Sequence, residues 1–211
     1  MRLYIRPIAP NALKVLIFMT ERGIALEMVD VGALSDADYA RVSPLKTVPS
    51  LETDDGLFIT ESLTICQYLD EVSEGPSLFG DSLDERALVA MWERRAEQLL
   101  VQPAIEYGHH CQPMFTGALR QFPDWAREHV QQCQKMLALM EVRLAETRFL
   151  AADRFTMADL TAFLGVAGLI GWGAIDLKPG PSLGRWLGEI GSRPSMAPLR
   201  ALAQQFGLKS I

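Results

Sequence analysis

The first 75 residues contain short segments with the two-residue period of a strand and longer segments with helical spacing. The pattern predicts strands over residues 2–6 and 25–31, a hairpin over 46–62, and helices over 11–23, 35–43 and 62–72. Strands and helices in this order predict an α+β sheet domain covered by helices.

Beyond about residue 84 the strand pattern stops, and apolar residues recur at helical spacing to the end of the chain. Helices are predicted over residues 84–101, 124–146, 156–171, 183–191 and 198–206. The segment 74–83 between the two patterns contains Gly, Pro and Ser and is typical of a linker. We therefore expect two domains, an α+β domain over residues 1–76 and an all-helical domain over residues 84–211.

The predicted hairpin has a proline where a strand would normally donate a hydrogen bond. SLET and LFIT alternate about the turn sequence Asp54-Asp55-Gly56, and Pro49 stands at the start of this pattern. Because proline has no N–H, it is confined in sheets to edges, strand starts and bulges. Pro49 either marks the end of an edge strand or has another use.

The composition is that of a globular protein. Of the 211 residues, 49% are hydrophobic and 22% are charged, which argues against a disordered chain. The formal net charge is -6, and Lys and Arg are scattered along the chain, which argues against nucleic acid as a partner. Gly or charged residues interrupt every long apolar run, and the start lacks a signal-peptide pattern, so we expect a cytoplasmic protein that does not enter a membrane.

The cysteines do not suggest a redox or metal site. Cys66, Cys111 and Cys133 are widely spaced and contain no CxxC pair. This spacing predicts neither a disulfide framework nor a zinc site. We expect reduced thiols in the core or on helix faces, and no metal.

Four features together resemble the cytosolic glutathione transferase family. They are the order of strands and helices at the start, the segment 46–62 followed by ICQYLDE, the sequence TMADL of residues 156–160, and the stretch from Trp186 to Ser195. The resemblance covers essentially the whole chain. It implies a thioredoxin-like first domain, an all-α second domain, and glutathione as the co-substrate.

The resemblance assigns the glutathione contacts to the first domain. It implies a cis bond before Pro49, so that the backbone of Val48 pairs with the cysteinyl part of glutathione like an added strand. Glu61 and Ser62 would hold the γ-glutamyl group at a helix N-terminus, where the dipole favours a carboxylate. Taken by itself, Ser62 would be explained as a helix cap. The glycyl carboxylate would meet one of two neighbouring residues, Lys46 or Thr47.

At the thiol-activating position this sequence departs from the family pattern. Most members place a Tyr, Ser or Cys near the end of the first strand or the start of the first helix. Aligned on Lys14-Val15, the position of the serine is occupied by Ala9. Tyr4 lies too early in the strand and is expected in the core. Asn11 either donates its side-chain amide to the thiol or merely caps the helix.

The sequence EYGHHCQPMFTG in the helical domain offers a second source of activation. VQPAIEYGHH is similar to the corresponding stretch of an atypical fungal and bacterial subgroup, in which a histidine and a hydroxyl hold a water that replaces the missing side chain. The resemblance implies His110 and Thr116 for this pair, with His109 and Tyr107 as substitutes. A histidine with a pKa of about 6.5 can accept a proton at neutral pH. The alternative is that the histidines form a partly exposed helix end.

The electrophile pocket is expected between the loop before the first helix and the helical domain. Its expected lining residues are apolar or aromatic, which implies a hydrophobic co-substrate. They are Ile8, Tyr107, Met114, Phe115 and Trp172.

We therefore predict a glutathione transferase that conjugates the glutathione thiolate to a hydrophobic electrophile, as in detoxification. Three alternatives stay open: a glutathione-dependent disulfide or peroxide reductase using Asn11, a non-catalytic glutathione- or ligand-binding protein, and a dimeric scaffold with no glutathione site. The resemblance implies a homodimer formed by the helix after Ser62 and by the helix that contains Arg94 and Arg95. Thr156 and Asp159 are predicted to form a capping box with a role in folding.

Overall fold

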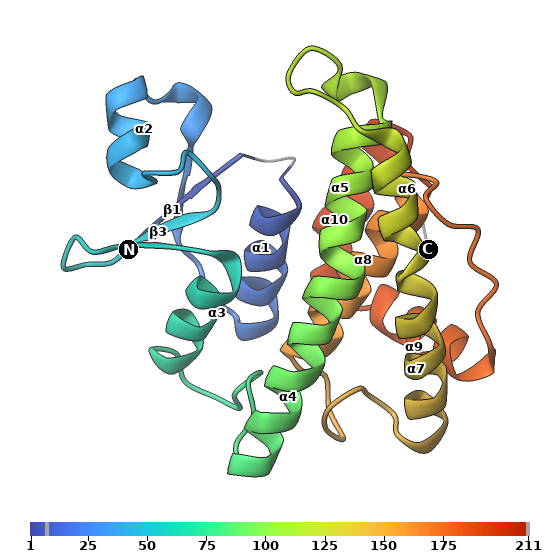
Figure 1. Cartoon of the computed structure of the whole chain (residues 1–211). Helices are drawn as coiled ribbons and strands as arrows, with labels where there is room; N and C mark the ends of the chain where they lie inside the picture. Colours follow the sequence, from blue (N-terminus) through green and yellow to red (C-terminus); the bar gives the residue numbers. More distant parts are fainter. Residues whose placement is uncertain (7–8, 210–211) are drawn as a thin grey trace. The chain divides into compact units, whose positions relative to one another are not determined.

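The computed structural model describes residues 1–6 and 9–209. The chain divides into two compact units, Met1–Ser77 and Leu78–Ile211 (Figure 1). The first contains a sheet and helices, and the second consists of helices. The α+β fold followed by an all-α part is therefore confirmed.

The sheet of the first unit has four strands in the order β2-β1-β3-β4. The strands are β1 (Arg2–Ile5), β2 (Glu27–Asp30), β3 (Ser50–Glu52) and β4 (Phe58–Thr60). β1 pairs in parallel with β2 and antiparallel with β3, so that Leu3 stands opposite Met28 on one side and Leu51 on the other. β3 and β4 form the antiparallel hairpin expected from the sequence.

Helices cover the sheet because successive strand residues point to opposite faces. On one face, Tyr4 forms a buried cluster with Val31 and with Val42 of α2 (Asp36–Val42), and the short 3-10 turn η1 (Val31–Ala33) lies before that helix. Leu3 is fully buried on the opposite face. Helices α1 (Pro10–Arg22) and α3 (Ser62–Glu71) pack side by side (Figure 1).

The second unit is built around α8 (Met157–Gly171), which is apolar on nearly every side and is buried accordingly. Helix α8 packs against α4 (Leu83–Ala96) and α9 (Pro181–Gly191). The helical elements besides α8 are α4 (Leu83–Ala96), η2 (Glu97–Val101), α5 (Gln102–Cys111), η3 (Pro113–Phe115), α6 (Pro123–Gln131), α7 (Cys133–Glu146), α9 (Pro181–Gly191), η4 (Pro194–Met196) and α10 (Ala197–Phe206). No helix in the described ranges is long and apolar enough to cross a membrane.

Two of the long helices expected from the sequence are not regular. Between α4 and α5 the backbone makes a π-helical turn, η2, against which α8 packs closely because Gly165 has no side chain. A Cβ at residue 165 would lie 2.5 Å from the Cβ of Leu100. The helix expected over residues 124–146 is divided at Gln132, where hydrogen bonds of the tighter i to i+3 type replace the α-helical ones.

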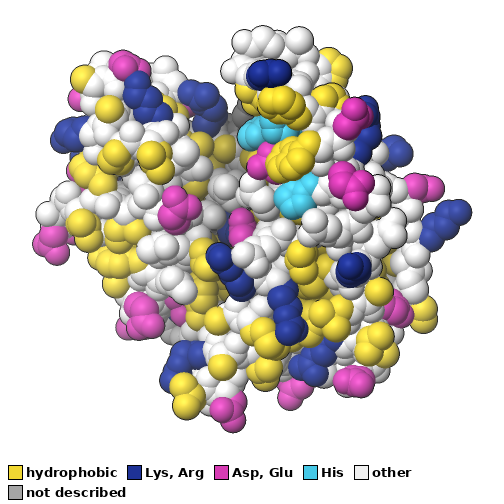
Figure 2. Space-filling model, in the orientation of Figure 1, with side chains coloured by type: hydrophobic (Ala, Val, Ile, Leu, Met, Phe, Trp, Pro, Cys, Tyr) yellow, Lys and Arg dark blue, Asp and Glu magenta, His cyan; other side chains and the backbone are white. Residues whose placement is uncertain are grey.

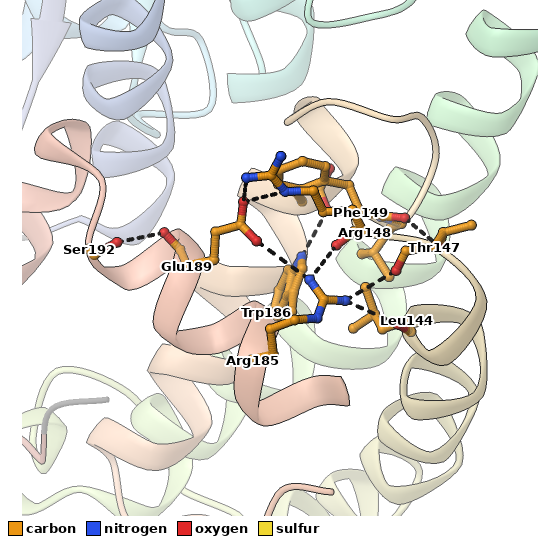
Figure 3. A network of polar contacts seen from close by, with 10 residues as sticks. Leu144, Thr147, Arg148, Phe149, Arg185, Trp186, Glu189 and Ser192 are labelled. Atoms are coloured by element: carbon orange, nitrogen blue, oxygen red, sulfur yellow. Dashed lines mark hydrogen bonds and ion pairs between the residues drawn. The ribbon is translucent and has the colours of Figure 1, made fainter. Parts of the chain in front are cut away.

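Polar side chains hold the ends of the helices in the second unit. Asp159, fully buried, accepts the backbone N–H and the hydroxyl of Thr156, so the predicted capping box is confirmed. On α9, Arg185 donates to the carbonyl groups of Leu144 and Arg148, at and beyond the end of α7 (Figure 3). These carbonyls would otherwise lack an intrahelical partner.

Candidate active site

The loop between α2 and β3 contains the cis peptide bond that the sequence led us to expect. The Val48–Pro49 bond is cis, and Pro49 lies buried immediately before β3, so the strand loses no hydrogen-bond donor within the ladder. The side chain of Val48 packs against the cluster around Tyr4. Among the described residues, no backbone hydrogen bond engages the N–H or C=O of Val48. Both groups can therefore pair with an extended peptide.

Two residues earlier, Lys46 has a left-handed backbone with a φ of 51°. Its ammonium group pairs with the carboxylate of Asp36 in the first turn of α2, and both side chains reach solvent. The backbone N–H of Thr47 donates to the hydroxyl of Ser43 at 3.1 Å. Lys46 and Thr47, the two candidates for contact with the glycyl carboxylate, are thus both held by the α2 region. Of the two side chains, that of Lys46 carries a charge.

At the end of β4, the chain enters α3 through a second left-handed residue. Glu61 has a φ of 70° and is the N-cap residue, and its carbonyl accepts the N–H of Ile65 at 2.9 Å. Ser62 is the first residue inside the helix, so it is not the cap that its sequence position alone would suggest. Non-glycine residues rarely adopt a positive φ, and such residues cluster at functional sites. The turn leaves the side chain of Glu61 exposed and that of Ser62 at the helix N-terminus.

The start of α1 lies against the start of α3. Ala9 is the N-cap of α1 and provides no side-chain hydrogen bond, and Asn11 is the second helical residue, so Asn11 is not the cap. The hydroxyl of Ser62 lies 3.5 Å from the Oδ1 of Asn11. Because each helix N-terminus carries partial positive charge, this meeting point favours an anionic ligand. Ile8, expected to line the pocket, lies outside the described residues.

In the helical unit, both ring nitrogens of His110 have partners. Nε2 lies 3.2 Å from the carboxylate of Glu106, one turn earlier in α5, and Nδ1 accepts the backbone N–H of Phe122 at 3.4 Å. The ring also contacts Trp125, with a centroid distance of 5.4 Å. Figure 2 shows histidine side chains grouped with hydrophobic and acidic ones on this face of the molecule. His110 is therefore engaged on both nitrogens by its own unit.

His109 has a different environment. Its ring meets the ring of Phe115 edge-on at 4.9 Å, and within the described part of the chain neither of its ring nitrogens has a hydrogen-bond partner. Burial lowers the pKa of His109, the nearby Glu106 carboxylate raises it, and a neighbouring histidine lowers it, with a net lowering. The imidazole of His109 is therefore neutral at neutral pH and can accept a proton.

Thr116 does not hydrogen-bond with His110. Its hydroxyl donates to the Oε1 of Gln121 at 3.1 Å. The Nε2 of Gln121 in turn donates to the backbone carbonyl of His109 at 2.8 Å. Gln121 thus ties the loop containing Thr116 to the end of α5.

The expected pocket residues of the helical unit come partly together. The rings of His109, Phe115 and Trp172 form an aromatic cluster, with 6.5 Å between the centroids of Phe115 and Trp172. Trp172 packs onto Gly108, where a Cβ would lie 2.9 Å from the indole Nε1. Met114 belongs to the same turn as Phe115 but is 53% exposed. Tyr107 is half-buried in α5.

The described residues contain no group of three or more His, Cys, Asp or Glu side chains that could hold a metal ion. Cys66 and Cys133 are buried, and Cys111 is half-buried. Burial raises the pKa of Cys133 to about 12 and also raises the pKa of Cys111. Such thiols are poor nucleophiles.

Three polar side chains near these elements were not predicted as site residues. Glu106 could have been found, because it stands one helical turn before His110 and side chains at this spacing are neighbours on a helix surface. Gln121 and Tyr39 donate hydrogen bonds to backbone carbonyl groups across turns, and no periodicity in the sequence predicts such contacts.

Comparison with known families gives matches over both units. Residues 3–77 match the model of the glutathione S-transferase N-terminal domain, and residues 123–189 match that of the glutathione S-transferase C-terminal domain.

Similar proteins include glutathione S-transferase 2 of Saccharomyces cerevisiae, which is 28% identical over 94% of this chain and 89% of its own length. A solved glutathione S-transferase domain-containing protein of Marinobacter aquaeolei is 35% identical, with a TM-score of 0.82 over 93% of this chain and all of its own. A glutathione S-transferase of class Gtt2 from Vibrio parahaemolyticus is 29% identical, with a TM-score of 0.81 over 93% of this chain and 96% of its own. These names favour a transferase over the reductase and non-catalytic alternatives.

Proposed function

Because the chain belongs to the glutathione S-transferase family and is a transferase enzyme, we propose that it joins glutathione to a hydrophobic electrophile. The thiol of glutathione gives its proton to a base or to solvent, and the thiolate sulfur forms a bond to an electrophilic carbon, from which a leaving group departs with its electron pair. The observation that carries this proposal is the meeting of two helix N-termini at Asn11 and Ser62. Two positive helix ends favour an anionic carboxylate and an anionic sulfur.

The glutathione contacts follow the backbone of the first unit. Val48 pairs with the cysteinyl peptide groups through its N–H and C=O, while Ser62 and the first N–H groups of α3 hold the γ-glutamyl carboxylate. The exposed carboxylate of Glu61 receives the γ-glutamyl ammonium group. Lys46 supplies the charge for the glycyl carboxylate, and Thr47 stands beside it.

For the thiolate, the first candidate is Asn11. Its Oδ1 is directed to the hydroxyl of Ser62, which leaves the Nδ2 amide group as a donor toward a sulfur atom. The N–H groups in the first turn of α1 add to this, because Ala9 provides no side-chain oxygen to compete for them.

The second candidate is a histidine of the helical domain that accepts the thiol proton through a water molecule. His109 fits this role better than His110, because its ring nitrogens have no partner among the described residues. Both nitrogens of His110 are engaged by Glu106 and Phe122. Thr116 would act only indirectly, through Gln121.

The electrophile is proposed to be apolar because the aromatic cluster of His109, Phe115 and Trp172 presents rings. Met114 and Tyr107 would extend this lining. We further propose a cytoplasmic homodimer with a role in detoxification. α4 has Leu88 and Met91 more than a third exposed, which suits a partner surface.

The test is a pH titration of bound glutathione, with the thiolate followed by its ultraviolet difference absorbance. We expect the pKa of the bound thiol to lie clearly below its ordinary value of about 8.5. Asn11→Ala, His109→Gln and His110→Gln are titrated beside the wild type. The variant that returns the thiol pKa toward its solution value identifies the activating side chain.

We expect the pKa of the bound thiol to return toward its solution value in Asn11→Ala or in His109→Gln, and to change less in His110→Gln. If the thiol pKa returned toward its solution value only in His110→Gln, the preference for His109 would be wrong. If glutathione binds with an unshifted thiol pKa, the transferase mechanism is wrong in its activating step. If glutathione does not bind, the assignment of Val48, Glu61 and Ser62 is wrong.

A further inference from the structure

Tyr39 of α2 makes a hydrogen bond to the backbone of the loop that is proposed to bind glutathione. Its hydroxyl donates to the carbonyl oxygen of Lys46 at 2.7 Å, and its ring packs against the same buried cluster as Val48. We infer that Tyr39 is a positioning residue for glutathione, acting through the backbone of Lys46 on Val48. This inference rests on the proposed function.

The backbone of Lys46 needs a restraint. A non-glycine residue in the left-handed region has an intrinsic cost, and it persists only where the surroundings hold it. Here both backbone groups of Lys46 are engaged by one short segment. Its N–H donates to the carbonyl of Ser43 at 2.9 Å, and its C=O accepts the phenol of Tyr39.

The conformation of Lys46 sets the direction of the two peptide groups that follow. The carbonyl of Lys46 belongs to the peptide unit of Thr47, whose N–H donates to the hydroxyl of Ser43. The next peptide unit presents the N–H of Val48. If the Lys46 carbonyl were released, the bond from the Thr47 N–H to Ser43 would alone hold this peptide unit, and rotation about the bond before the carbonyl would change the directions of both N–H groups.

Besides Tyr39, no described side chain holds the Lys46 carbonyl. The ion pair of Lys46 with Asp36 acts at the end of a flexible side chain and is exposed, so it restrains the backbone weakly. The hydroxyl of Tyr39 therefore holds the carbonyl side of Lys46, while Ser43 holds the N–H groups of Lys46 and Thr47.

The experiment measures the Kd of glutathione by calorimetry for wild type and for Tyr39→Phe, which keeps the ring and removes the hydroxyl. We expect the Kd to rise about fivefold, as for one lost hydrogen bond, with kcat at saturating glutathione unchanged. Tyr4→Phe is the matched control, because Tyr4 also donates through its phenol at 2.7 Å, to Glu52 within the sheet. It is expected to leave the Kd unchanged.

A double-mutant cycle with Lys46→Gly separates positioning from a general structural effect. Glycine adopts the left-handed conformation without the cost, so the hydroxyl of Tyr39 has less to restrain. The effect of Tyr39→Phe on the Kd should then fall below about twofold in the Lys46→Gly background. An equal effect in both backgrounds would overturn the inference, as would an unchanged Kd in Tyr39→Phe.

These outcomes differ from failure of the proposed function. If wild type does not bind glutathione, the proposed function fails and this inference fails with it. If wild type binds and Tyr39→Phe binds equally well, only the role of Tyr39 is wrong. Equal thermal unfolding of Tyr39→Phe and Tyr4→Phe, with a changed Kd in Tyr39→Phe alone, would support positioning.

Discussion

The carboxylate of Glu141 in α7 accepts the backbone N–H of Leu183 at 2.8 Å, at the start of α9. It also accepts the N–H of Ser182 at 3.1 Å. The N-cap residue of α9 is Gly180, which has no side chain to perform this capping. A residue 42 positions away thus satisfies the first turn of the helix.

We expect Glu141→Gln to reduce the free energy of unfolding near neutral pH. The N–H of Leu183 is the main cause that lowers the pKa of Glu141. A carboxyl group whose pKa is lower in the folded state stabilises the fold above its unfolded pKa of about 4.3, and this stabilisation is lost as the pH falls through the folded pKa. Urea unfolding at pH 7 and at pH 3 should therefore show a difference between variant and wild type that narrows in acid.

Glu128→Gln serves as the control for this comparison. Glu128 is an exposed carboxylate of α6, which accepts from a single side-chain amide, that of Gln131. It should change stability little at either pH. A Glu141→Gln difference of equal size at both pH values would contradict capping by the charged form.

We expect Asp159→Ala to cost at least about 3 kcal/mol of stability. The carboxylate of Asp159 also accepts the backbone N–H of Leu150 and the indole N–H of Trp186, so its removal leaves several buried donors without a partner. Thr156→Ala should cost only about 1 kcal/mol, the usual cost of a lost cap. Urea unfolding followed by tryptophan fluorescence measures both. Equal losses of stability in Asp159→Ala and Thr156→Ala would mean that Asp159 stabilises the fold only through its hydrogen bonds to Thr156.

We expect Gly108→Ala to raise the KM for the electrophile several-fold and to leave the Kd of glutathione unchanged. A methyl group at residue 108 would lie 2.9 Å from the Nε1 of Trp172, so the indole must move and the aromatic cluster changes shape. Steady-state kinetics with an aromatic electrophile at saturating glutathione measures this.

The control is Gly188→Ala in α9, where a Cβ would meet nothing within 4 Å. It is expected to raise stability by about 1 kcal/mol through helix propensity and to leave both constants unchanged. If Gly108→Ala also leaves the KM for the electrophile unchanged, Trp172 does not line the electrophile site.

We expect Lys46→Gly to be more stable than Lys46→Ala by about 1 kcal/mol. Both variants lose the ammonium group and its exposed ion pair with Asp36, so this comparison cancels the charge. What remains is the cost of a Cβ at a φ of 51°. Chemical unfolding of the two variants gives the difference. A more stable alanine variant would show that the loop leaves the left-handed conformation.

The sequence was sufficient to predict features with a local or periodic cause. The strands over residues 2–6 and 25–31, the hairpin turn at Asp54-Asp55-Gly56 and the helix closed by Gly23 all have short-range signals, and the structure confirms them. The cap formed by Thr156 and Asp159 was also predictable, because its two residues lie within one turn.

Other features have causes that lie far away in the sequence. Pro103 has no N–H to donate to the carbonyl of Leu99 and so interrupts the α-helical bonding next to η2, but no local signal predicts the π-helical form, which occurs where α8 approaches closely at Gly165. Helical spacing continues through Gln132, although the chain tightens there. One partner of His110 is the backbone N–H of Phe122, which lies beyond a loop. Helical periodicity could therefore not predict this contact. Resemblance to a family indicated which residue types to examine, and only the packing distinguished His109 from His110.

Gly165 limits which positions of the helical unit can be varied. An added Cβ there would lie 2.5 Å from the Cβ of Leu100 and 2.8 Å from the backbone nitrogen of Val101, so any other residue at 165 would force α8 or the π-helical turn to shift. A library that diversifies this part of the helical unit should keep position 165 fixed. It should place its variation at Met114, whose side chain is more than half exposed and has space to change.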